Sequence, residues 1–328
     1  MGPLPTLLEE REGRKAVERV FDAESIPLAV IEHRDFWIPL TSLEGLFERA
    51  ARATGDPMLG FHVGLGMMPD DYGLWAQYSS QATCLGNALK RIVSTLHLHE
   101  TGTQMRIVPR PGDQVAWEYC YPGVSTSASR HYTNHIVPGL IQFLQGYLGS
   151  DWRPSCIEVG YSAPHRTADL ETTTEATWVF NRKALAIVFP SAALKIKRPL
   201  SPDQESERLV TSVDLEAETS PTCIKTPIDT IRSVISLRLL DGLCDIDGAA
   251  KVLRVGCRKL QRQLETEGTT YSSLVSQIRM GRAKCFIEET DASLKRICFE
   301  LGYSDPAHFS RAFTRHFGYP PSALRKRT

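Results

Sequence analysis

The chain has 328 residues, of which 42% are hydrophobic and 23% are charged, and its formal net charge is zero. This composition is that of an ordinary globular protein, and the length suits two domains better than one. The longest apolar runs, such as ALAIVF at 184–189, are only as long as a strand, so we expect no membrane span. The N-terminal stretch also lacks the pattern of a secretory signal, and we therefore expect a cytoplasmic protein.

Eight cysteines are scattered along the chain without a C-x-x-C pair, which indicates reduced thiols and not a disulfide or zinc framework. His131 and His135 are four residues apart, and His97 and His99 are two apart. Neither pair is completed by a Cys, Asp or Glu at ligand spacing. We expect no metal and no cofactor.

The first 200 residues mix helical and strand periodicity. Helical spacing begins near Thr41 and Ser42, which are possible caps, and returns at 85–99 and 135–149. Alternating arms around the turn PRPGD predict a β-hairpin over 104–121. Two further segments, 156–162 and 184–190, have strand composition. These elements predict an α+β domain with a modest sheet.

A change of composition at 198–227 marks the best domain boundary, because this stretch holds four prolines and many acidic and hydroxyl side chains. We therefore expect one domain at 1–200, a linker at 201–226 and a separate domain at 227–328. From Ile224 to Thr328 there are 18 Lys and Arg against 11 Asp and Glu, a net charge of +7. A basic C-terminal third in a neutral chain is one possible mark of nucleic-acid binding.

The C-terminal third shows helical periodicity and almost no strand signal, so we expect an all-α domain. A last turn is expected to start at the prolines of 320–324. The predicted helices are 227–243, 245–253, 257–268, 270–290, 293–301 and 305–318.

This region repeats itself. The segment AAKVLRVGCRKLQRQL (249–264) aligns with ICFELGYSDPAHFSRAF (297–313) when one residue is inserted after the turn. Each copy reads as a short helix, a tight turn and a second helix, which is the helix-turn-helix unit whose second helix enters the DNA major groove. We expect two such units joined by the long helix 270–290. The matched positions are Ala250 with Cys298, Leu253 with Leu301, Leu260 with Phe309, Arg262 with Arg311, and Leu264 with Phe313.

The second copy shows how such a unit is specified. Gly302 permits the sharp turn, and either Ser304 or Asp305 accepts hydrogen bonds from the free N–H groups of the next helix. Phe309 and Phe313 are four residues apart and fasten one face to a core, so the remaining polar residues point away from it.

On these residues the C-terminal third resembles the AraC/XylS family of bacterial transcription regulators. The stretch LGYSDPAHFSRAFTRHFGYPPSALR (301–325) is similar to the family's signature, and 260–287 is similar to its first recognition helix and linking helix. Three positions of the first copy depart from the family. Arg254 stands where Gly is common, Gly256 where a Ser cap is usual, and Cys257 where Pro is frequent.

Residues 38–92, 149–164 and 181–200 resemble the arabinose-binding-type effector domain of one AraC subgroup. The resemblance implies a ligand-responsive regulator, more often an activator than a repressor, that binds double-stranded promoter DNA as a homodimer and acts on RNA polymerase. It also implies that the domain at 1–200 dimerises and binds a small-molecule effector, which the resemblance does not identify, and that the domain at 227–328 binds DNA.

The resemblance also implies which side chains face DNA. Arg is suited to guanine or phosphate, and Gln to adenine. The expected DNA-contacting residues are Arg258, Lys259, Gln261, Arg262, Ser304, Pro306, Ala307, His308, Ser310, Arg311 and Arg315.

A small-molecule site needs apolar walls with a few polar groups, and the N-terminal domain offers aromatic and basic candidates for these roles. An acidic ligand would require a cation, for which Arg130 is one choice. The expected effector-binding residues are Tyr72, Trp75, Trp117, Tyr119, Arg130, His131 and His135.

Two other readings remain open at this point. In the first, the protein is a DNA-binding regulator whose N-terminal domain only dimerises and binds no effector. In the second, an enzyme is joined to the DNA-binding part, but the sequence holds no G-x-S-x-G, phosphate loop or H-E-x-x-H motif that would supply catalysis. We therefore expect that the protein is not an enzyme.

Overall fold

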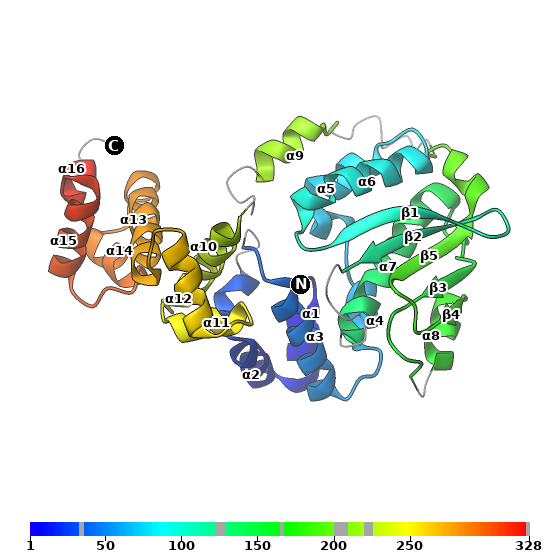
Figure 1. The fold of residues 1–328 in the computed structure, drawn as a ribbon, viewed down its shortest axis with the longest axis horizontal. Helices are drawn as coiled ribbons and strands as arrows, with labels where there is room; N and C mark the ends of the chain where they lie inside the picture. Colours follow the sequence, from blue (N-terminus) through cyan, green and yellow to red (C-terminus); the bar gives the residue numbers. More distant parts are fainter. Residues whose placement is uncertain (33–35, 122–128, 165–166, 200–208, 220–225, 326–328) are drawn as a thin grey trace. The chain divides into compact units, whose positions relative to one another are not determined.

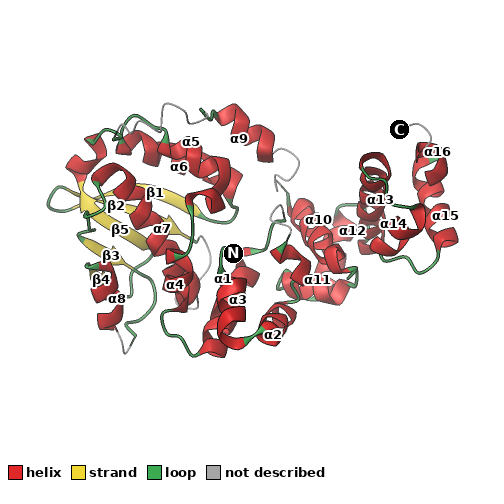
Figure 2. Cartoon of the chain, turned by 180° about the vertical axis from the view of Figure 1, so that it is seen from behind, coloured by secondary structure: helices red, strands yellow, loops and turns green. Residues whose placement is uncertain are grey.

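The computed structural model describes residues 1–32, 36–121, 129–164, 167–199, 209–219 and 226–325. It divides into two compact units (Figures 1 and 2). The first, here called the sheet unit, comprises residues 1–17 and 43–223, and the second, the helical unit, comprises residues 18–42 and 224–328. Within the described residues, no helix is both long and apolar enough to cross a membrane.

The sheet unit is built on one five-stranded sheet in the order β1-β2-β5-β3-β4. Its strands pair antiparallel, except that β3 and β4 are parallel. The strands are β1 (Gln104–Arg110), β2 (Gln114–Cys120), β3 (Cys156–Glu158), β4 (Thr177–Val179) and β5 (Leu185–Pro190).

The predicted hairpin and the β5 segment are confirmed, whereas β3 is shorter than the expected strand 156–162 and β4 was not expected. Only three residues of β3 pair with β5, and the next residue, Val159, donates its amide to Val179 of β4 at 2.9 Å. β4 pairs with β3 alone at one edge of the sheet, so neither its length nor its pattern distinguishes it in the sequence.

Helices α6 and α7 contact the sheet through β1 and β5, and Figure 2 shows the yellow strands flanked by the red helices of the same unit. α7 begins five residues before the predicted start at 135. Residues 212–219, inside the expected linker, form a helix that packs on α5 and α6. The helices wholly within the sheet unit are α1 (Leu4–Glu12), α4 (Leu59–Leu65), α5 (Gly73–Ser80), α6 (Leu85–His99), α7 (Arg130–Leu148), α8 (Thr167–Thr174) and α9 (Ser212–Thr219), with 3-10 turns η2 (Pro69–Tyr72) and η4 (Ser191–Lys195).

The two faces of β2 differ in chemistry because successive side chains point to opposite sides of a strand. Trp117 packs its ring against Phe143 of α7, with the ring centroids 5.8 Å apart. On the other face, Glu118 accepts from Arg106 at 2.5 Å and from Arg110 at 2.7 Å. The sheet is therefore fastened by apolar packing on one side and by ion pairs on the other.

The helices predicted for residues 227–328 are present in the helical unit. Their ends lie within about two residues of the predicted ones, except at the end of the first helix. That helix ends at Arg238 and continues as the 3-10 turn η6, which Gly242 closes in the left-handed region. The C-terminal elements are α10 (Pro227–Arg238), η6 (Leu239–Asp241), α11 (Ile246–Val252), α12 (Cys257–Thr266), α13 (Tyr271–Glu289), α14 (Leu294–Glu300), α15 (Pro306–Phe317) and α16 (Pro321–Arg325).

The N-terminal segment 18–42 completes the helical unit. It holds the end of α2 (Arg14–Glu24), the 3-10 turn η1 (Leu28–Ile31) and the start of α3 (Leu40–Thr54). η1 contacts η6, and the amide of Leu28 donates to Asp241 Oδ2 at 3.0 Å.

A buried arginine holds the start of α11. Arg238 is 3% exposed, and its guanidinium donates to the carbonyl of Asp245 at 2.7 Å and to its carboxylate at 2.8 Å. The same carboxylate caps α11 by accepting from the amide of Gly248 at 2.6 Å. These bonds hold the pKa of Asp245 below its usual range, with the Arg238 hydrogen bond as the largest cause.

Gly248 is required here by space. A Cβ at this position would lie 1.9 Å from Arg238 Nη2, whereas one at Gly281 in α13 would meet nothing within 4 Å. Gly248→Ala should therefore displace the buried guanidinium and lower the free energy of unfolding by about 2 kcal/mol. Gly281→Ala, the matched control, should raise it by up to about 1 kcal/mol, because alanine restricts the unfolded chain. Urea unfolding followed by circular dichroism measures both, and equal changes would contradict the assignment.

Candidate nucleic-acid interface and effector region

Two helix pairs, α11 with α12 and α14 with α15, share one kind of turn. In the first pair, Val255 donates its amide to the carbonyl of Ala250 at 3.0 Å, while Arg254 adopts a φ of +52°. In the second pair, Tyr303 donates to Cys298 at 3.0 Å, and Gly302 has a φ of +74°. This is the Schellman ending of a helix, in which a left-handed residue reverses the chain.

The helices that follow these turns begin differently. Asp305 caps α15, since its carboxylate accepts from the amides of Ala307 at 2.9 Å and His308 at 3.1 Å. These hydrogen bonds, that of Ala307 first, hold the pKa of Asp305 below its usual range. The structure thus selects Asp305 over Ser304. Gly256 precedes α12 and provides no side-chain cap.

Each of α12 and α15 is fastened by two buried apolar side chains four residues apart. Leu260 and Leu264 are 0% and 1% exposed, and Phe309 and Phe313 are 1% and 0% exposed. The two phenylalanine rings also contact each other, with centroids 6.0 Å apart. Because these residues occupy one stripe of each helix, the opposite stripe is left to solvent.

Nearly all of the expected DNA-contacting residues lie on these open stripes. On α12 the exposed side chains are Arg258, Lys259, Gln261 and Arg262. At α15 the exposed residues are Ser304, Pro306, Ala307, His308, Arg311 and Arg315, and Ser310 is half-buried.

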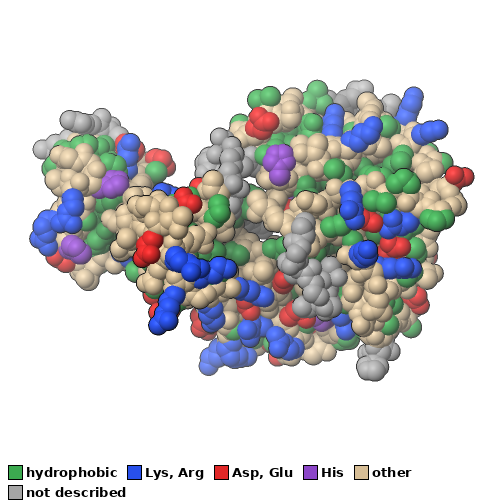
Figure 3. Space-filling view, in the orientation of Figure 1, with side chains coloured by type: hydrophobic (Ala, Val, Ile, Leu, Met, Phe, Trp, Pro, Cys, Tyr) green, Lys and Arg blue, Asp and Glu red, His purple; other side chains and the backbone are tan. Residues whose placement is uncertain are grey.

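The Lys and Arg side chains of these exposed stripes form few ion pairs with acidic side chains. Within the part of the chain that the structure describes, no ion pair is recorded for Arg258, Lys259 or Arg262, and Arg311 lies 3.9 Å from Asp305. Figure 3 shows blue Lys and Arg side chains over the places of α12 and α15. Unpaired cations on an open helix face are suited to phosphate oxygens and to guanine.

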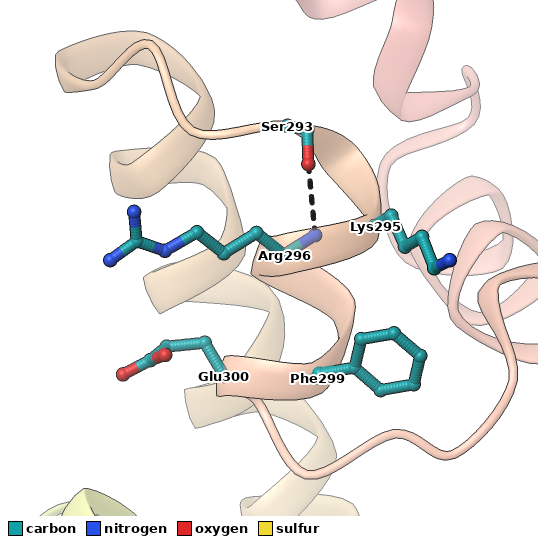
Figure 4. Close-up of a pocket in the computed structure, with 5 residues that line it drawn as sticks. All are labelled: Ser293, Lys295, Arg296, Phe299 and Glu300. Carbon is teal, nitrogen blue, oxygen red and sulfur yellow. Dashed lines mark hydrogen bonds between the residues drawn. The ribbon is translucent and has the colours of Figure 1, made fainter.

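A second exposed face lies on α14 and was missed from the sequence. A hollow of about 470 Å³ is lined by Ser293, Lys295, Arg296, Phe299 and Glu300. Figure 4 shows Lys295 and Phe299 on one side of α14, and Arg296 and Glu300 on the other. Phe299 is 50% exposed. The available signal was the aromatic residue at a position that the repeat does not assign to the core.

In the sheet unit, the expected effector residues form two groups. In the first group, Trp75 stacks on His99 with ring centroids 4.3 Å apart, and Tyr72 lies 6.2 Å from the same imidazole. Burial raises the pKa of Tyr72 to about 12 and lowers that of His99 to about 4. Trp75 also donates its indole N–H to Thr95 at 3.1 Å.

The second group joins β2 to α7. Tyr119 and Tyr121 meet edge to face with centroids 5.1 Å apart, and Tyr121 lies 6.0 Å from Tyr132. The ring of His135 is 4.7 Å from that of Tyr132. Burial raises the pKa of all three tyrosines, so the group is uncharged near neutral pH.

Trp117, Arg130 and His131 have other surroundings. The indole N–H of Trp117 is buried and finds no acceptor among the described residues. Arg130 donates to the carbonyl of Pro57 at 2.6 Å, and the backbone amide of His131 donates to Glu48 at 2.8 Å. Arg130 therefore already has a partner in the protein.

Sequence reasoning missed His99 as an aromatic partner, together with Tyr121, Tyr132 and Asn134. Tyr161 donates to Asn134 Oδ1 at 2.5 Å in the interior. No local pattern separates these residues from other core positions, because each meets a partner on another segment: His99 of α6 meets Trp75 of α5, and Tyr132 of α7 meets Tyr121. In the described ranges, no group of three His, Cys, Asp or Glu is placed to hold a metal ion.

Comparison with known proteins gives two family matches. The model described as the arabinose-binding domain of AraC transcription regulators, N-terminal, matches residues 16–197, and a helix-turn-helix domain model matches 249–327. The regulator VqsM of Pseudomonas aeruginosa is 24% identical over 325 residues, which cover 94% of this chain and 98% of VqsM.

Other similarities are shorter or weaker. The transcriptional activator RhrA of Rhizobium meliloti is 31% identical over 99 residues, which are 30% of this chain and 32% of RhrA. The crystal structure of the regulator CdpR from Pseudomonas aeruginosa covers 93% of this chain and 98% of its own, at 18% identity and a TM-score of 0.41.

A mixed N-terminal part with a sheet, followed by a helix-turn-helix region, defines a DNA-binding transcription regulator and not an enzyme. The arabinose-binding-domain model alone matches more than half of the chain. The protein belongs to the AraC family of transcription regulators.

The buried histidines predict how the stability of the sheet unit depends on pH. Burial lowers the pKa of His135 to about 3. In the unfolded chain this imidazole takes up a proton near pH 6.5, whereas in the folded protein it stays neutral, so stability is lost as the pH falls below about 6.5. Between pH 7 and pH 5 the loss from one such histidine is about 2 kcal/mol.

His135→Gln should therefore flatten the dependence of the urea midpoint on pH. Phe47→Leu is the matched control, since Phe47 packs on His135 at 4.5 Å and does not titrate. It should lower the midpoint equally at both pH values. An unchanged pH dependence in His135→Gln would show that this imidazole is not held neutral.

Proposed function

We propose that α11–α12 and α14–α15 are two helix-turn-helix units, joined by α13, that read neighbouring segments of one DNA site. The supporting observation is the shared geometry of the two pairs, with the same Schellman turn and the same buried i,i+4 anchor beneath each exposed stripe. Two recognition helices suit successive major grooves about 34 Å apart on one face of DNA.

In this proposal Arg262 and Arg311 read bases, because they hold equivalent exposed positions in the two units. The side chains of Arg258, Lys259, Gln261 and His308 complete the reading faces. Ser304, Pro306, Ala307, Ser310 and Arg315 lie against the backbone or sugar edges. DNA recognition by α12 and α15 is thus the function that the exposed residues support best.

We expect Arg262→Ala and Arg311→Ala each to weaken binding to the preferred site by about 1–3 kcal/mol, and binding to random duplex by much less. The site is obtained by selection from random DNA, and affinity is measured by fluorescence anisotropy at fixed salt. Lys251→Ala removes one exposed cation from α11 and is the matched control. Equal losses on both DNAs would assign the arginines to phosphates, and unchanged binding would remove them from the interface.

We also propose that the protein acts as a homodimer and responds to a small molecule through the sheet unit. One helical unit fits one asymmetric site, so a second copy would raise affinity for paired sites through effective concentration. Anisotropy titrations of the full chain on one and on two half-sites test the dimer. A thermal-shift screen of metabolites tests the effector, and the absence of any stabilising compound would favour a domain that only dimerises.

We propose, finally, that the protein activates transcription, as its relative RhrA, a transcriptional activator, does, and that the α14 face then contacts RNA polymerase. The support is the half-exposed Phe299 beside Lys295, an aromatic anchor flanked by a cation. Such anchors carry most of the energy of protein interfaces.

The double variant Lys295→Ala, Phe299→Ala should bind DNA normally but lose about tenfold in transcription from a promoter that carries the selected site. Leu243→Ala, which removes another exposed apolar side chain from the same unit, should keep both activities. Transcription in vitro and anisotropy measure the two readouts. Parallel loss of DNA binding, or full activity, would contradict this role.

A further inference from the structure

The turn of the first helix-turn-helix unit carries a residue that its local geometry does not favour. Arg254 has a φ of +52°, a conformation that costs an L-residue about 1–2 kcal/mol and that glycine adopts freely. The equivalent residue of the second unit is Gly302. We therefore expect the arginine side chain to make an interaction that offsets the free-energy cost of this backbone conformation.

That interaction is made with the N-terminal segment 18–42. The Arg254 guanidinium donates to the backbone carbonyl of Thr41 and lies 3.9 Å from the carboxylate of Glu24. The Glu24 side chain is only 11% exposed, so this charge is partly screened from water. A glycine at 254 would form the same turn but could make neither contact.

Two further hydrogen bonds hold the same segment, one to α11 and one to the turn η6 that precedes α11. Ser42, 1% exposed, donates to the carbonyl of Val252 at 3.4 Å, in the last turn of α11. The Leu28 amide donates to Asp241 at 3.0 Å. The segment is therefore held at Glu24, at Leu28 and at Thr41 and Ser42. The Arg254 side chain contacts both the first of these places and the last.

By sequence, this segment belongs to the other half of the protein. The arabinose-binding-domain model matches residues 16–197, which include all of 18–42. In the structure these residues group with the helix-turn-helix region, and helices α2 and α3 continue from the segment into the sheet unit. Glu24 ends α2 and Thr41 lies in the first turn of α3, so each of these helices carries one of the residues that contact Arg254.

We propose that residues 18–42 are a coupling segment, which Arg254 holds on the first helix-turn-helix unit so that the effector half can influence recognition helix α12. Arg254 is a positioning residue in this role. It acts by fixing the segment against the turn and not by touching a base. The proposal rests on DNA recognition by α12, but the contact itself can be measured without DNA.

Arg254→Gly isolates the side chain, because glycine relieves the backbone conformation and leaves the turn intact. Arg254→Asn is a second variant that tolerates the left-handed region and is too short to reach Thr41 or Glu24. In the full-length protein, hydrogen–deuterium exchange should show about tenfold faster exchange at amides of 18–42, that of Leu28 included. The melting temperature and exchange within α13 should be retained. Unchanged exchange in 18–42 would overturn the proposal.

DNA binding distinguishes coupling from a phosphate contact. If the segment orders the unit, Arg254→Gly should weaken binding to the selected site by about tenfold, and Glu24→Gln should weaken it in the same direction by about threefold. Glu24→Gln leaves the arginine charge in place. Loss in Arg254→Gly alone, with a shallower salt dependence, would make Arg254 a phosphate ligand and overturn the coupling role. If the wild-type protein selects no DNA site, the proposed function fails, while the exchange result still tests the contact.

Discussion

Burial of two apolar side chains four residues apart is the constraint on which the proposed DNA-binding surface depends. Leu260 with Leu264, and Phe309 with Phe313, fix the rotation of α12 and α15 about their own axes. Once that rotation is fixed, the outward residues follow from helical geometry alone. A single misplaced anchor would turn Arg262 or Arg311 away from the open stripe, so the core determines which side chains can meet DNA.

The turns before these helices show that one backbone geometry can be formed by different residues. Both use a left-handed residue after the first helix, and both form the same pair of backbone hydrogen bonds. In the second unit glycine adopts the left-handed conformation without a backbone cost, and the turn is contacted by Arg279 of α13, whose guanidinium lies 5.1 Å from the ring of Tyr303. In the first unit arginine accepts a backbone cost of about 1–2 kcal/mol and gains contacts outside the unit. The two copies of the repeat therefore share the backbone geometry of the turn but differ in the side-chain contacts that the turn makes with other segments.

The helical unit could be predicted largely from sequence, because its signals are local. Thr226, Asp245, Thr270, Ser293 and Asp305 each cap a helix through a side-chain oxygen, and Gly242, Gly302 and Gly318 mark helix ends with a positive φ. The sheet unit was less predictable. β4 and the end of β3 depend on pairing between distant segments, and α9 has no clear periodicity of its own. The grouping of 18–42 with the C-terminal helices depends on contacts more than 200 residues apart in sequence, which no local pattern reveals.

The two candidate sites also differ in how well the sequence predicts them. Arg and His side chains were selected in both halves of the chain by residue type, but burial gives them different chemistry. On α12, Arg258 and Arg262 are exposed, so their position in the repeat was enough to place them on the surface. In the sheet unit, burial lowers the pKa of His131 to about 4 and of His135 to about 3, and Arg130 is already bonded to a carbonyl. An interior of neutral imidazoles and phenols presents hydrogen bonds and not charge. Residue type alone therefore predicts an exposed cationic face better than a buried polar site, because burial keeps the enclosed histidines neutral.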